Sequence, residues 1–125
     1  MDNYSILLSK KKAELEENIP LVSGVWNKDY LCEYLVYLNC SDTEKMLWSF
    51  FKEHLKDRKL AEMLFDFLLD ESYNGSDAQI GAVFLMRNMD RDVLKECRHL
   101  ILQVKKSKAK WKIPFNDKEL KDIFN

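Results

Sequence analysis

The sequence contains little glycine and proline, with three glycines and two prolines among 125 residues. These residues interrupt helices and form tight turns, so their scarcity disfavours a fold of many short strands and hairpins. The three cysteines include no CxxC pair, which argues against a disulfide framework and against a zinc site. We therefore expect reduced thiols and long helices that are stabilised by an ordinary hydrophobic core.

Long hydrophobic runs are also missing. The apolar stretch within Met1–Ser9 is too short for a signal peptide, and no stretch approaches the roughly 20 apolar residues of a transmembrane helix. We therefore expect a cytoplasmic protein. The length suits one domain over residues 1–125, and a hydrophobic content of 46% can supply a single core. The oligomeric state is left open by the sequence.

Apolar residues recur at helical spacing in six or seven segments, which begin near residue 2 and end with a short helix near residues 116–124. The residues expected to cap these helices are Asn27, Ser41, Asp57, Ser76 and Asp90. Short connections between the helices predict antiparallel neighbours. The sequence therefore predicts an all-α fold of six to seven short antiparallel helices, arranged as an irregular bundle or as α-solenoid-like helix pairs.

Two of these helices carry more specific expectations. Gly81 and Ala82 lie in the helix that follows Ser76, where small side chains permit the close approach of a second helix. The helix that begins after Asp90 has apolar residues at helical spacing as far as Val104, and we expect it to be continuous.

The helix predicted over residues 27–40 has two apolar stripes that together cover about half of its surface. One stripe is made of leucines, and the other is aromatic: Trp26, Tyr30, Tyr34 and Tyr37. Core packing is the ordinary explanation, but a tyrosine also suits a half-wet surface because its hydroxyl keeps one end polar. We therefore retain Tyr34 and Tyr37 as candidate partner-binding residues.

Catalytic and phosphate-binding motifs are missing from the sequence. There is no Gly-rich phosphate loop and no HExxH motif. His54 and His99 are the only histidines, and neither lies in a pattern that pairs it with a nucleophile. We expect a binding protein rather than an enzyme, with no cofactor and no metal. A helical enzyme with a histidine in a deep pocket is a further alternative.

Charge is unevenly distributed, although the net charge is only −1. Residues 42–77 hold nine acidic and five basic residues, whereas residues 78–125 hold eleven basic and six acidic residues. Acidic side chains bracket a turn at Tyr73, at positions Asp66, Asp70, Glu71 and Asp77. Carboxylates beside an exposed tyrosine suit the capture of a basic protein partner. The alternative is that these carboxylates only cap helices and solvate the surface.

The segment Lys105–Lys112 is the best candidate for contact with nucleic acid. Its lysines can neutralise phosphates, and Trp111 can stack on a base. A helix end with solvated lysines and a buried tryptophan explains the same pattern, and the acidic remainder of the chain opposes nonspecific phosphate binding. A nucleic-acid-associated regulator is therefore the alternative to a protein-binding function.

The segment from Asp70 to Phe84 ends one helix in acidic residues, turns through Tyr73-Asn74-Gly75 and opens a helix of small residues. Over about residues 65–104 this pattern resembles small all-helical immunity proteins of bacterial contact-dependent growth inhibition and related polymorphic toxin systems. The resemblance implies a cytoplasmic inhibitor that binds a cognate toxin domain, frequently a basic nuclease. The carboxylates would then mimic phosphate, with Tyr73 as an anchor. The basic C-terminal third departs from that simple picture.

Overall fold

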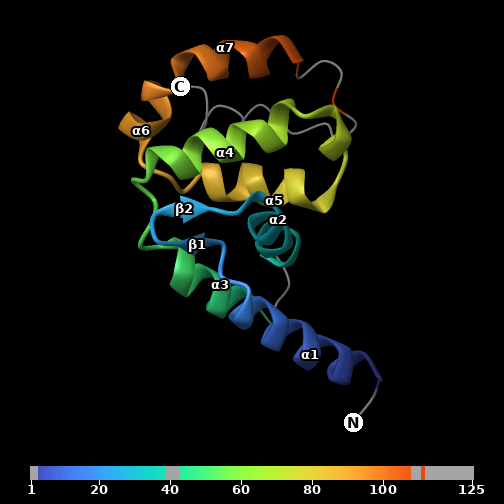
Figure 1. The fold of residues 1–125 in the computed structure, drawn as a ribbon. Helices are drawn as coiled ribbons and strands as arrows, with labels where there is room; N and C mark the ends of the chain where they lie inside the picture. Colours follow the sequence, from blue (N-terminus) through green and yellow to red (C-terminus); the bar gives the residue numbers. More distant parts are fainter. Residues whose placement is uncertain (1–2, 39–42, 108–110, 112–125) are drawn as a thin grey trace.

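The computed structural model describes residues 3–38, 43–107 and 111. Over these residues the chain forms seven α-helices, one short 3₁₀-helix and one two-stranded sheet, and the predicted all-α fold class is confirmed (Figure 1). The elements in chain order are α1 (Asn3–Glu17), β1 (Leu21–Val22), β2 (Val25–Trp26), α2 (Lys28–Tyr37), α3 (Glu44–Phe51), α4 (Arg58–Leu69), η1 (Glu71–Tyr73), α5 (Asp77–Met86), α6 (Arg91–Glu96) and α7 (Arg98–Ser107).

Four of the five predicted caps are confirmed, because capping depends on hydrogen bonds between near neighbours in sequence. The side chain of Asn27 accepts from the backbone N–H of Tyr30, and those of Asp57, Ser76 and Asp90 cap α4, α5 and α6 in the same way. The fifth predicted cap, Ser41, and the expected helix near residues 116–124 lie outside the described residues.

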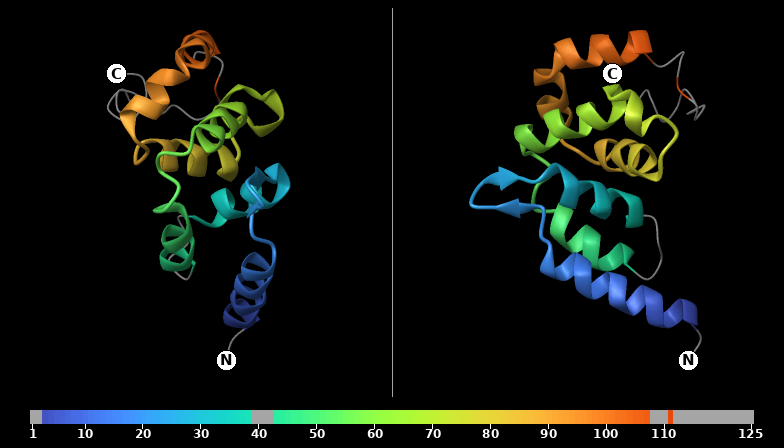
Figure 2. Two further views of the ribbon diagram at one scale, coloured as in Figure 1. Left: turned by 60° about the vertical axis from the view of Figure 1, so that its left-hand side comes forward. Right: turned by 45° about the vertical axis from the view of Figure 1, so that its right-hand side comes forward.

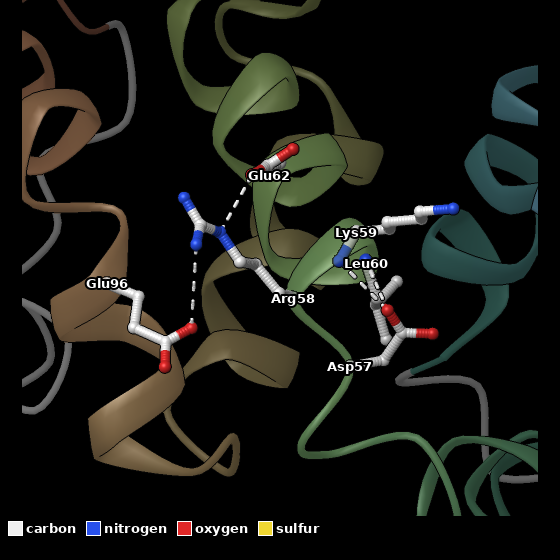
Figure 3. A network of polar contacts seen from close by, with 6 residues as sticks. All are labelled: Asp57, Arg58, Lys59, Leu60, Glu62 and Glu96. Carbon is white, nitrogen blue, oxygen red and sulfur yellow. Dashed lines mark hydrogen bonds and ion pairs between the residues drawn. The ribbon is translucent and has the colours of Figure 1, made fainter.

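The start of α4 is also tied to its surroundings by ionic contacts (Figure 3). Arg58 Nε lies 3.1 Å from Glu62 Oε1 on the same helix, and Arg58 Nη1 lies 3.9 Å from Glu96 Oε2 on α6. All three side chains are about half exposed, so these pairs contribute little to stability.

The core lies where α5 packs against both α2 and α4. In Figure 1 the helices α7, α4, α5 and α2 follow one another from the top of the molecule towards its middle. Gly81 of α5 meets the backbone of α2 directly, because a Cβ atom built on it would lie 2.1 Å from the carbonyl oxygen of Leu35. The predicted close approach of a helix at this small residue is confirmed.

Two features depart from the expected helices. The first is a hairpin that the helical pattern does not predict, in which Leu21 pairs with Trp26 and Val22 with Val25 around a two-residue turn with positive φ angles. The continuous helix expected from Asp90 to Val104 is wrong, because the backbone leaves the helical region at Cys97 (φ −94°, ψ 32°) and divides α6 from α7. Within the described residues, no helix has both the length and the apolar content needed to cross a bilayer.

Candidate protein-binding surface

The junction of α4 and η1 places Asp70, Glu71 and Tyr73 close together, and we refer to these three residues as the acidic corner. Asp70 ends α4 and caps η1, since its Oδ1 accepts hydrogen bonds from the backbone N–H of Ser72 at 2.9 Å and from the Ser72 hydroxyl at 2.7 Å. These hydrogen bonds, together with the Lys28 ammonium, lower the pKa of Asp70. The carboxylate is therefore ionised at neutral pH.

Tyr73 is held in place by two contacts. Its ring packs edge-on against Phe67, with centroids 4.7 Å apart, and the Nζ atom of Lys28 lies 5.3 Å from the Tyr73 centroid. The same Nζ atom lies 5.4 Å from the Phe67 centroid and 3.7 Å from Asp70 Oδ2. The ring remains partly accessible, so it can meet a partner in an orientation that is already fixed.

A cavity of about 450 Å³ adjoins the acidic corner. Asp70 and Glu71 line one side of it, and Lys106 and Trp111 belong to its lining as well. The structure therefore brings part of the basic segment to the acidic corner, although the sequence suggested these as alternative binding sites. Lys108, Lys110 and Lys112 lie outside the described residues.

Asp66 and Asp77 lie apart from that cavity. Asp66 is exposed one helical turn before Asp70 and lines a second, more open hollow of about 620 Å³ beside His99 and Leu100 of α7. Asp77 is exposed at the start of α5 and lines neither hollow. Over the described ranges, neither of these carboxylates nor that of Glu71 forms an ion pair. Their negative charges are directed to solvent or to a partner.

The two tyrosines predicted on α2 differ in exposure. Tyr34 is only 4% exposed, and its hydroxyl donates a 2.6 Å hydrogen bond to the carbonyl oxygen of Leu15. A buried ring cannot contact a partner without local unfolding, so we remove Tyr34 from the candidate surface. Burial also raises the pKa of its hydroxyl. Tyr37 is half-buried, with the Lys11 Nζ atom 5.2 Å from its ring centroid, and it stays a candidate.

Lys28 is the residue of this surface that the sequence did not indicate. It contacts Asp70, Phe67 and Tyr73 although about 40 residues of chain separate it from them. No local spacing identifies such a contact, because it forms only when α2 packs beside α4 and η1. Lys28 orients the acidic corner rather than adding to its charge.

The histidines lie in different surroundings. His54 packs between Trp26 and Phe50, with ring centroids 5.4 and 4.9 Å away, as part of an aromatic cluster. His99 is exposed and lines the hollow that contains Asp66. In the part of the chain that the structure describes, no group of three or more His, Cys, Asp or Glu side chains is placed to hold a metal ion.

The acidic corner combines exposed carboxylates with an aromatic ring that its neighbours hold in one orientation. No protein-family model, curated protein sequence or solved structure matches the chain.

Proposed function

We propose that this chain is an immunity protein that binds a cognate toxin domain, a basic nuclease, and neutralises it by steric block. The observation that carries the proposal is the acidic corner, where the exposed carboxylates of Asp70 and Glu71 lie beside a tyrosine that is already oriented. Carboxylates at such a site attract a basic surface over long range, and an oriented aromatic side chain provides a central anchor. Inhibition is then stoichiometric and involves no turnover.

The exposed carboxylates beyond the corner extend the negative surface. Asp66 and Asp77 carry charges that no described basic side chain neutralises. Both carboxylates can therefore attract a basic partner. A stable complex buries about 1,600 Å² in total. The acidic corner therefore forms the centre of a larger contact that includes the faces of α4 and α5 beside it.

The cavity beside the corner favours a protein over nucleic acid. A phosphate that approached Lys106 and Trp111 would also approach the carboxylates of Asp70 and Glu71. An arginine or lysine of a protein partner meets the two carboxylates and the Trp111 ring, and these attractions oppose the repulsion from the single Lys106 ammonium in the lining. The nucleic-acid alternative predicts RNA or DNA binding without a protein partner, with an affinity that falls steeply as salt rises.

The decisive experiment starts with the tagged chain purified from its own host. We expect one co-purifying protein with a secreted toxin domain, whose expression alone arrests growth and whose co-expression with this chain does not. Titration of the purified toxin with the chain should abolish toxin activity at an equimolar ratio. A toxin that stays active at equimolar chain, or substrate conversion by the purified chain alone, would refute the proposal.

Charge-reversal variants locate the binding surface. The variant D66K/E71K should associate with the toxin about tenfold more slowly at low salt, because electrostatic steering is lost. The matched control E16K/E53K makes the same change in charge at exposed positions at the end of α1 and just after α3. Equal association rates for the two variants would remove the acidic corner from the interface.

A further inference from the structure

The helix α1 exposes most of the side chains that the structure describes on it. Leu15 is buried on it, whereas Ile6 is 39% and Leu7 63% exposed. In Figures 1 and 2 the N-terminal half of α1 extends past the other elements in every view. A free helix of 15 residues is only marginally stable in water, so α1 depends on packing against other groups for its stability.

The charges of α1 are arranged against its own helix dipole. Lysines occupy positions 10–12, no acidic residue lies in the first turn, and no basic residue lies in the last turn, where Glu14, Glu16 and Glu17 gather. The C-terminal end of a helix carries partial negative charge and favours cations. The helix is thus basic in its middle and acidic at its end, an arrangement that its own backbone does not favour.

One outward face of α1 likewise carries a basic residue in its middle and an acidic residue at its C-terminal end. Ile6, Lys10, Ala13 and Glu17 follow one another at spacings of four, three and four, so they lie along one side of the helix. All four are exposed. Lys11 differs, because it lies on the inner side and pairs with Glu14 and Glu33. Among the described side chains, Lys10 and Glu17 form no ion pair.

We propose that this face binds the same face of a second copy of the chain, with the two α1 helices antiparallel. A twofold axis between Ala13 and Glu14 places Lys10 opposite Glu17 of the second copy, and by symmetry the reverse pair forms as well. The small Ala13 lies near the axis, where it allows the helices to approach closely.

The proposed dimer face does not overlap the acidic corner, since α1 lies at the other end of the molecule from it (Figure 1). A single pair of short helices buries less than a standard interface of about 1,600 Å², so the dimer is weak and reversible. Its attraction depends on exposed ion pairs, and it therefore weakens as salt rises.

Sedimentation equilibrium over a wide range of protein concentrations tests the proposal. The weight-average mass of the wild-type chain should rise with concentration towards that of a dimer. Either K10E or E17K should lower the association constant about tenfold, because each turns both symmetry-related attractions into repulsions. An equimolar mixture of K10E and E17K should recover association, since both cross-pairs between the two variants join opposite charges. The double variant K10E/E17K should also recover it.

The controls are K12E and E16K, which make the same charge changes on another side of the same helix. These variants should associate as the wild type does. Circular dichroism verifies that every variant keeps its helix content. A wild-type chain that stays monomeric at all concentrations overturns the proposal. So does a mixture of K10E and E17K that associates no better than either variant alone.

Discussion

The close contact between α2 and α5 leads to a quantitative prediction for Gly81→Ala. The added Cβ atom would lie 2.1 Å from the carbonyl oxygen of Leu35, 2.8 Å from its carbonyl carbon and 3.0 Å from its Cα. These are backbone atoms of a buried helix, so no side chain can rotate away to make room. The two helices would have to move apart at the centre of the core.

Two effects of opposite sign decide how much stability the Gly81→Ala variant loses. Overpacking of a core costs about 1–3 kcal/mol, and a clash with backbone belongs at the upper end of that range, near 3 kcal/mol. Alanine is better than glycine in a helix interior by about 1 kcal/mol, which offsets part of the cost. The expected loss is therefore about 2 kcal/mol. In a domain of this size it corresponds to a fall in Tm of roughly 8 °C.

Urea denaturation followed by circular dichroism measures this loss. The midpoint should fall while the m-value stays unchanged, because the surface exposed on unfolding is the same. A rise in stability would refute the reasoning, since it would mean that helix propensity dominates and that α2 and α5 have room to separate.

Two further predictions concern aspartates that cap helices. Asp57→Ala should cost about 2–3 kcal/mol, because it removes the cap of α4 and also the acceptor for the buried Trp26 indole N–H. Asp90→Ala should cost only about 1 kcal/mol because it removes a cap alone, and equal losses in urea melts would exclude a separate contribution from the indole bond. Asp70→Asn should destabilise the protein at neutral pH, since hydrogen bonds from Ser72 hold the pKa of Asp70 below its ordinary value and stabilise its ionised form. That stability is present above the ordinary aspartate pKa and is lost as pH falls through the lowered folded-state pKa. The melting temperatures of the wild type and the variant should therefore converge at acid pH. A difference that stays constant with pH would contradict this explanation.

The elements that the sequence predicted correctly are those set by near neighbours. The caps at Asn27, Asp57, Ser76 and Asp90 depend on contacts that span two or three residues, and all four form. The break at Cys97 was not predictable in the same way, because the apolar spacing continues through it while the chain turns to cover α4. A two-residue strand is likewise too short to produce an alternating pattern.

The candidate site was less predictable because its geometry depends on tertiary contacts. The apolar arc of α2 was wide enough for either stripe to face the core, and only packing shows that Tyr34 lies inside while Tyr37 lies at the boundary. The meeting of Lys106 with Glu71 at one cavity follows from α7 lying against α4. Whether these residues bind a toxin stays a prediction.

The contact of Lys28 with both the acidic corner and Phe67 has a consequence for how binding can be detected. Lys28 opens α2, so any molecule that immobilises Tyr73 and Asp70 also restrains the first turn of that helix. Thermodynamic linkage is reciprocal. A ligand at the acidic corner slows amide hydrogen exchange in α2, and a change that holds α2 more firmly against the corner raises the affinity of the corner for its ligand. Exchange rates at the start of α2 can therefore report occupancy before the partner has been identified.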